Sequence, residues 1–275
     1  MPINPLFQRL TLLTGTETMD ALTRTRAIVF GAGGVGSWCA EALVRSGVGG
    51  VTIVDSDTVC VTKINRQIQA TTGTVGKFKV EVLRTRLLEI NPGCSVTAWG
   101  KVFSRETMGE FYIGGADYCI DAIDSLAHKL DLIEYTVKMG TRLFSSMGMA
   151  RKLDPTRLKT ADIWETRGCP LARLVRGGLR KRNFTGHFTA VYSDEQLPPR
   201  REIEVPCGSP QCLCPSRNRG EPGAPVEWCG SKKVINGSAV PVTASAGMIL
   251  ASLVIRDVCA RIDAKAGPVQ GRPHG

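Results

Sequence analysis

The chain has 275 residues, of which 43% are hydrophobic and 22% charged, and it carries a formal net charge of +10. This composition indicates a soluble globular protein with one large core, or with one core and a smaller subdomain. The first 14 residues, interrupted by Pro2 and Pro5, lack the apolar run of a secretory signal, which argues against a secreted protein. We therefore expect a cytoplasmic protein whose ten cysteines stay reduced, and the excess of basic residues favours a polyanionic partner.

An N-terminal arm, residues 4–10, and a short predicted helix over 18–23 lead to the segment with the strongest pattern. The apolar run Ala27 to Phe30 predicts a buried strand, and Gly31-Ala32-Gly33-Gly34-Val35-Gly36 follows it as a G-x-G-x-x-G turn. The first glycine of such a turn permits the tight bend, the second lets backbone amides approach a phosphate, and the third lets the next helix pack closely on the strand. Because a helix N-terminus also attracts anions, this segment predicts a nucleotide-binding site.

The next elements complete a βαβ unit. Val35 to Ser46 has apolar residues at helical spacing, and Val51 to Val54 is a second apolar run that predicts a strand. Asp55 follows this strand, 19 positions after Gly36, where an acidic residue accepts hydrogen bonds from a ribose hydroxyl. A glycine-rich turn can also bind nothing, but the two strands and the acid together favour nucleotide binding.

Alternating elements continue to residue 147. After a long irregular loop, residues 56–74, the patterns predict helices over 78–90, 105–113 and 126–139 and strands over 96–99, 117–121 and 143–146. This alternation predicts an α/β, Rossmann-like fold, in which a mostly parallel sheet carries helices on both faces. Ligands of such sheets bind at the carboxyl ends of the strands, so the phosphate turn, Asp55 and residues 121–124 should share one rim.

Several charged residues fall on this rim. Asp57, Lys63 and Arg66 lie in the long loop, and Lys79 follows a few residues later. Together they suit a triphosphate, and Asp124 adds the hard oxygen ligand that Mg²⁺ prefers. Each of them alone has an ordinary interpretation, such as a surface lysine, a helix cap or a salt bridge, so the prediction depends on their clustering.

The pattern becomes irregular after Gly148, which predicts a smaller C-terminal portion over 148–262 beside a nucleotide-binding domain over 1–147. This portion contains a predicted strand over 188–192 and a loop over 197–233 that is rich in Pro, Gly and Cys. The uncharged stretch 237–255 has the length of a membrane span, but Pro241 and several hydroxyl side chains favour a buried C-terminal helix over 242–262. Residues 263–275 are predicted to be a disordered tail.

A basic helix is predicted over Leu171 to Arg182. Its cationic side chains are Arg173, Arg176, Arg180, Lys181 and Arg182, and the three at positions i, i+3 and i+7 share one face. No acidic residue in this stretch neutralises them. The pattern therefore favours contact with a phosphate backbone over a merely solvated face.

Four cysteines of the irregular loop form the pattern C-x₄-C-x-C-x₁₄-C: Cys207, Cys212, Cys214 and Cys229. Four thiolates suit tetrahedral Zn²⁺, but the usual C-x₂-C pairs are missing, so free thiols stay a slightly better interpretation. Five further cysteines lie in apolar runs and are predicted to be core: Cys39, Cys60, Cys94, Cys119 and Cys259. Cys169 has no assignment.

In order along the chain, these motifs resemble the adenylating superfamily shared by ubiquitin-activating enzymes and the bacterial thiamine and molybdopterin adenylyltransferases. The resemblance spans residues 4–147 and rests on Arg9, the 31–36 turn, residues 55–59, Arg66-Gln67, residues 75–80, Ile90-Asn91-Pro92 and Asp121-Ala122-Ile123-Asp124. One branch, the tRNA threonylcarbamoyladenosine dehydratases, is more similar, on residues 45–49, 59–70, 154–156, 169–172 and 191–195.

This resemblance implies an enzyme that uses ATP to cyclise the N6-threonylcarbamoyl group of adenosine 37 in tRNA through an acyl-adenylate. It implies that Asp55 holds the ATP ribose, Arg66 and Lys79 hold the phosphates, Asp124 holds Mg²⁺, and Arg9 reaches into the neighbouring subunit of a homodimer. The remaining ATP contacts would be Gly31, Gly33, Gly34, Gly36, Asp57 and Lys63, and the basic helix would contact tRNA. The sequence departs from the family in two places: Lys63 stands where an asparagine is usual, and Leu6 where an arginine is common.

Two alternatives stay open. The same residues could adenylate the C-terminus of a ubiquitin-like or sulfur-carrier protein, with sulfur-relay proteins as partners. That activity predicts a transfer loop with a free cysteine, whereas the histidines His128 and His187 are not near a cysteine in sequence. A non-enzymatic protein that binds tRNA or nucleotide is the other alternative, because Lys63 changes a site residue of the family.

Overall fold

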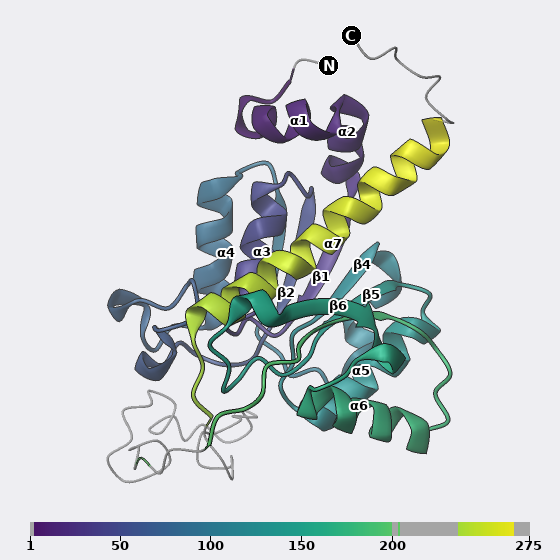
Figure 1. Cartoon of the computed structure of the whole chain (residues 1–275). Helices are drawn as coiled ribbons and strands as arrows, with labels where there is room; N and C mark the ends of the chain where they lie inside the picture. Colours follow the sequence, from purple (N-terminus) through teal and green to yellow (C-terminus); the bar gives the residue numbers. More distant parts are fainter. Residues whose placement is uncertain (1–2, 200–202, 204–235, 267–275) are drawn as a thin grey trace.

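The structure, a computed structural model, describes residues 3–199, 203 and 236–266 (Figure 1). Within them one sheet has the strand order β3-β2-β1-β4-β5-β7-β6, in which β6 is antiparallel to β7 and all other neighbours are parallel. The strands are β1 (Arg26–Phe30), β2 (Gly50–Val54), β3 (Ser95–Trp99), β4 (Tyr118–Asp121), β5 (Arg142–Ser146), β6 (Leu158–Asp162) and β7 (Thr189–Ser193). The predicted α/β fold with a mostly parallel sheet is confirmed.

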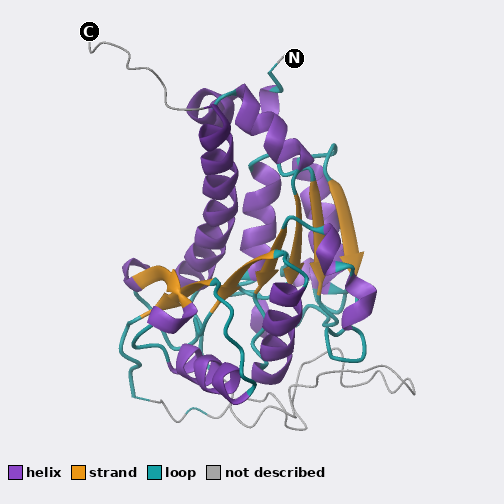
Figure 2. Ribbon diagram, turned by 90° about the vertical axis from the view of Figure 1, so that its right-hand side faces the viewer, coloured by secondary structure: helices purple, strands orange, loops and turns teal. Residues whose placement is uncertain are grey.

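Helices cover both faces of this sheet (Figure 2). They are α1 (Gln8–Thr14), α2 (Thr16–Arg24), α3 (Gly36–Arg45), α4 (Lys79–Ile90), α5 (Leu126–Lys138), α6 (Pro170–Lys181) and α7 (Val240–Ala266). Strand β1 shows how one segment serves two cores, since successive side chains point to opposite faces. Ala27 and Val29 pack with α2, α3, α4 and α7, whereas Ile28 and Phe30 pack with α5 and α6.

Helix α7 is the described helix that is long and apolar enough to cross a membrane, by length and composition alone. It instead crosses α3 at close range, because a Cβ atom on Gly247 would come within 2.5 Å of the Val35 carbonyl oxygen. Val242, Leu250 and Val254 are fully buried in the same core as β1. We therefore interpret α7 as a core helix, as the sequence predicted.

Two sequence predictions need correction, and one strand was missed. The helix expected over 105–113 is replaced by two short 3₁₀ turns, Met108–Phe111 and Ile113–Gly115, separated by Tyr112 in a left-handed conformation with φ of 43°. Strand β6 was not predicted, because its side chains are half-buried or exposed and show no alternation. Helix α7 extends to Ala266, so residues 263–266 do not belong to a tail.

The predicted boundary at residue 147 divides the sequence pattern but not the core. Strands β6 and β7 extend the sheet begun by the first half, and α7 packs on α3 and α2. The described C-terminal residues are therefore part of the same packed unit as the nucleotide-binding half.

Candidate functional site

The glycine turn lies between the carboxyl ends of β1 and β4, and its backbone requires glycine at two places. Gly31 has φ of 92°, in the left-handed region, and a Cβ atom there would come within 2.7 Å of the Ala122 carbonyl oxygen. A Cβ atom on Gly36 would lie 1.9 Å from the carbonyl oxygen of Gly31. The turn is thus folded tightly on itself and against residue 122, and it leads directly into the N-terminus of α3.

Asp55, at the carboxyl end of β2, holds this turn from one side. Its Oδ2 accepts a hydrogen bond of 2.8 Å from the Ala32 N–H, and its Oδ1 accepts one of 2.9 Å from the Asp57 N–H. Oδ2 keeps a lone pair for a further donor. Asp55 is therefore placed where its carboxylate could receive a ribose hydroxyl beside the phosphate turn.

Lys79, at the first position of α4, points into this group of carboxylates. Its Nζ lies 2.6 Å from Asp57 Oδ2 and 3.5 Å from Asp55 Oδ1, and the residue is only 4% exposed. Burial alone would lower the pKa of Lys79, but the two carboxylates outweigh it and raise that pKa above its usual value. Lys79 is thus a charged, nearly enclosed ammonium whose third proton alone remains for a phosphate.

Arg66 belongs to the long loop, residues 56–74, and its side chain reaches over the glycine turn. Its aliphatic stem rests on Gly34, where a Cβ atom would come within 3.2 Å of Cγ and Cδ, and its Nη1 donates to Asn65 Oδ1 and to the Thr62 carbonyl oxygen. Burial lowers the pKa of the Arg66 guanidinium, and the charge of Asp124 opposes this shift. The structure thus brings Arg66, Asp124 and the glycine turn together.

A buried ion pair supports the loop that carries Asp124. Lys129 Nζ lies 2.6 Å from Asp121 Oδ2, and both side chains are fully buried. The other carboxylate oxygen of Asp121 accepts a 3.1 Å hydrogen bond from the Ile123 N–H, and Oδ2 also accepts one of 2.6 Å from Ser145 Oγ. The ion pair therefore fixes the backbone between the end of β4 and Asp124.

Sequence reasoning missed three contacts of this site. Asn65 bridges Arg66 to the Ser238 carbonyl oxygen, just before α7, and Gln69 donates a 2.8 Å hydrogen bond to the Ala32 carbonyl oxygen. Thr243 of α7 lies against Gly34. These contacts join segments more than 30 residues apart, so no local pattern could have indicated them; the only signal was the polar residues within the apolar stretch of α7.

Arg9 lies on α1, at the end of the molecule opposite to the glycine turn (Figure 1). It is exposed, and Leu6, Leu12 and Leu13 around it are 60%, 72% and 80% exposed. Arg9 therefore cannot reach the site of its own chain. The predicted role of Arg9 in the site of a neighbouring subunit stays a prediction.

The basic helix α6 presents part of its charge to solvent. Arg173, Arg180 and Lys181 are exposed, whereas Arg176 is half-buried and donates to Thr166 Oγ1. Arg182 departs from the prediction, because its Nη1 bonds Asp131 Oδ1 at 2.7 Å and Glu134 Oε2 at 2.6 Å on α5. Its charge is neutralised within the chain, so the exposed basic face consists of the three residues named first.

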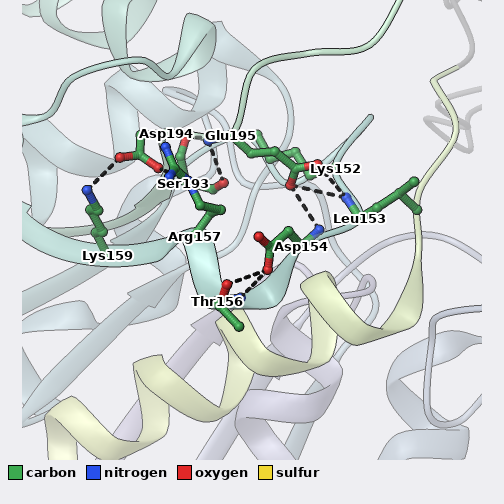
Figure 3. Close-up of polar contacts among 9 residues, drawn as sticks. All are labelled: Lys152, Leu153, Asp154, Thr156, Arg157, Lys159, Ser193, Asp194 and Glu195. Carbon is green, nitrogen blue, oxygen red and sulfur yellow. Dashed lines mark hydrogen bonds and ion pairs between the residues drawn. The ribbon is translucent and has the colours of Figure 1, made fainter.

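A polar cluster follows the carboxyl end of β7, beside the yellow helix α7 (Figure 3). The Glu195 carboxylate accepts hydrogen bonds from the backbone N–H groups of Leu153 and Asp154, and Asp194 pairs with Arg157 and Lys159. These contacts tie the segment after β5 to the end of β7. They shape the rim beyond Asp124 on the side of the basic helix.

Metal sites made by protein ligands alone are not found in the described part of the chain, where no group of three or more His, Cys, Asp or Glu could hold a metal ion. The four cysteines proposed for Zn²⁺, Cys207, Cys212, Cys214 and Cys229, lie outside the described residues. The cysteines predicted to be core are buried, except Cys259, which is partly buried, and Cys169 is also buried.

Comparison with known proteins identifies the family of this chain. The family model described as the ThiF family matches residues 7–265. The chain belongs to the ThiF family. It is 34% identical to the tRNA threonylcarbamoyladenosine dehydratase of Escherichia coli over 256 residues, which cover 90% of this chain and 91% of that relative. It is 43% identical to the enzyme of the same name from Bacillus subtilis over 189 residues, 69% of this chain and 74% of the relative.

A solved structure extends this likeness to three dimensions. The Escherichia coli tRNA N6-threonylcarbamoyladenosine dehydratase in complex with ATP superimposes on this ThiF-family chain with a TM-score of 0.77 and 31% sequence identity. The match covers 95% of this chain and 96% of the other. The similarity to the dehydratase branch that the motifs indicated therefore extends over 95% of this chain.

Proposed function

We propose that this protein is a tRNA threonylcarbamoyladenosine dehydratase, an enzyme that uses ATP to cyclise N6-threonylcarbamoyladenosine 37 of tRNA. The observation that carries the proposal is the meeting of Arg66, Asp124 and the glycine turn on one rim, in a chain that matches a dehydratase over nine-tenths of both lengths. The enzyme class and the fold are those of relatives with 34% to 43% identity.

ATP would lie along the rim from β2 to β4. The ribose would bind at Asp55, and the phosphates would bind at the backbone amides of the glycine turn and the N-terminus of α3. Arg66 extends over Gly34 and would face the same phosphates, while Lys63 adds a point charge from the loop. Lys79 contributes less directly than predicted, because its ammonium already contacts two carboxylates.

Mg²⁺ fits this site through Asp124. Magnesium bound to a nucleotide typically takes one or two carboxylates and completes its coordination with phosphate oxygens and water. Asp124 supplies such a carboxylate beside Arg66, and the described residues offer no larger ligand group that would compete. The metal would neutralise charge on the phosphates.

The chemistry follows from the substrate. A threonine carboxylate is a poor electrophile, so an oxygen of this group attacks the α-phosphorus, the bond to pyrophosphate breaks, and an acyl-adenylate forms. A neighbouring carbamoyl atom then attacks the acyl carbon, the bond to AMP breaks and one proton is released. Arg66 and the turn amides would stabilise the charge on the α-phosphate, and the intramolecular ring closure requires no covalent enzyme intermediate.

Two macromolecular contacts belong to this proposal. The exposed face of α6, with Arg173, Arg180 and Lys181, would contact the tRNA backbone close to the rim. The exposed leucines around Arg9 would pack on a second copy of the chain, which would bring Arg9 to the partner's site.

Adenylation of a carrier-protein C-terminus is the second candidate, and three of the described thiols do not suit its cysteine-transfer form. Burial raises the pKa of Cys39 and of Cys119 above the usual range and that of Cys94 to about 11. These thiols therefore hold their protons at neutral pH and are poor nucleophiles.

The decisive experiment incubates the protein with ATP, Mg²⁺ and tRNA that carries the open threonylcarbamoyl modification, followed by mass analysis of the nucleosides. We expect loss of one water from the modified adenosine, with release of AMP and pyrophosphate, and strongly reduced conversion by Arg66→Ala. An unchanged nucleoside mass under conditions where ATP binds would refute the dehydratase assignment. Transfer of AMP to a carrier-protein C-terminus instead would support the second candidate.

A further inference from the structure

The glycine turn, residues 31–36, is hydrogen-bonded on both sides of a single residue, Ala32. The N–H of Ala32 donates to Asp55 Oδ2 at 2.8 Å, and its carbonyl oxygen accepts a hydrogen bond of 2.8 Å from Gln69 Nε2. Ala32 is fully buried, and Gln69 is only 2% exposed. The two peptide groups that flank Ala32 are therefore oriented by one side chain each.

The contact with Gln69 determines where the next amide points. A trans peptide group holds its C=O and the following N–H in opposite directions. Because Gln69 holds the Ala32 carbonyl, the N–H of Gly33 must point away from Gln69 and out of the buried interior. In the described part of the chain this N–H has no protein acceptor. It belongs to the second glycine of the turn, whose amide is suited to approach a phosphate.

The side chain of Gln69 also has a feature that lowers the stability of the fold. Its amide oxygen Oε1 is buried without a hydrogen-bond partner among the described residues. An unsatisfied buried acceptor destabilises a folded protein, whereas an apolar side chain of the same shape would not. A glutamine at this position is therefore better explained by the donor at Nε2 than by packing.

We propose that Gln69 is a positioning residue that orients the Ala32–Gly33 peptide so that the Gly33 N–H faces the nucleotide phosphates. The inference rests on the proposed ATP site. It assigns Gln69 no contact with the reacting atoms: its effect passes through the backbone of the turn. Its removal should therefore weaken the binding of phosphates selectively and leave the binding of the nucleoside unchanged.

The test compares the affinities of wild-type protein and Gln69→Met for ATP and for adenosine, measured by calorimetric titration. Methionine has a similar length and shape but no N–H donor. We expect the affinity for ATP to fall about tenfold, as for the loss of one hydrogen bond to a charged group, and the affinity for adenosine to stay within about twofold. The thermal midpoint should change little, because the variant removes the unsatisfied Oε1 but also leaves the buried Ala32 carbonyl oxygen without a donor.

Thr136→Val serves as the matched control, since Thr136 is equally buried and hydrogen-bonded but lies on α5, away from the turn. It should change neither affinity. An unchanged affinity of Gln69→Met for ATP, or equal losses for ATP and adenosine, would overturn the role of Gln69 but not the proposed function. If Gln69→Met does not fold, Gln69→Leu, which also loses the donor and adds no charge, must show the same selective loss. A wild-type protein that binds no ATP would overturn the proposed function as well.

Discussion

Removal of the Lys129 ammonium should be among the most damaging single changes in the described fold. Lys129 Nζ contacts Asp121 Oδ2 at 2.6 Å and the Ser146 carbonyl oxygen at 3.0 Å, and neither charged side chain is exposed. In Lys129→Met the Asp121 carboxylate would keep its hydrogen bonds to Ser145 and Ile123 but would lose its only ion pair among the described residues. Breaking a buried pair in this way costs about 3–5 kcal/mol, because one charge is left uncompensated.

The assay is urea-induced unfolding, with the free energy of unfolding extrapolated to water. Lys138→Met makes the same chemical change on an exposed lysine of the same helix and should alter that free energy by no more than about 0.5 kcal/mol. The double variant Lys129→Met with Asp121→Asn removes both charges and should recover at least about 1 kcal/mol relative to Lys129→Met. A loss below about 1 kcal/mol in Lys129→Met, or a double variant less stable than the single one, would refute the reasoning.

Three further predictions follow from other parts of the molecule. Gly36→Ala places a Cβ atom 1.9 Å from the Gly31 carbonyl oxygen and should destabilise the fold by about 1–3 kcal/mol in thermal melting and abolish ATP binding in titration. Burial lowers the pKa of Lys152 below its usual 10.5, although the charges of nearby groups oppose this shift. The unfolded chain therefore binds more protons than the folded chain at alkaline pH, so wild-type stability should rise from pH 8 toward 10. This rise should be smaller in Lys152→Met, as measured by urea unfolding. Arg173→Glu with Arg180→Glu should weaken tRNA binding and reduce its logarithmic salt slope by about two, as measured by filter binding at several salt concentrations.

Each of these has a contrasting outcome. Full ATP affinity in Gly36→Ala would mean that the turn is looser than its geometry indicates. The same pH dependence in wild type and Lys152→Met would show that the lysine has an ordinary pKa. Arg182→Ala is the control for the tRNA face, because Arg182 is already paired on α5; a salt slope that falls as much in this variant would contradict the assignment of the exposed face.

The sequence by itself determined the βαβ unit and most of the sheet. The glycine turn, the apolar runs and Asp55 are local signals, because each depends on backbone conformation or on side-chain alternation over a few residues. Elements without such a signal were missed. Strand β6 is held by its pairing with β7 and by ion pairs to Asp194. The stretch after residue 105 contains Gly109 and a left-handed Tyr112, which prevent a regular helix.

Only the tertiary structure decided how the charges of the site are used. Lys79 and Arg182 carry the same sequence signal as Arg66 and Arg180. In the fold the first two form ion pairs with carboxylates at 2.6 Å, whereas Arg66 rests on the glycine turn and Arg180 faces the solvent. The hydrogen bond from Gln69 to the Ala32 carbonyl oxygen and the packing of α7 on α3 likewise join distant segments. Charge and hydrogen-bond pairing depend on distances in space, and those are set by the packing of the whole chain.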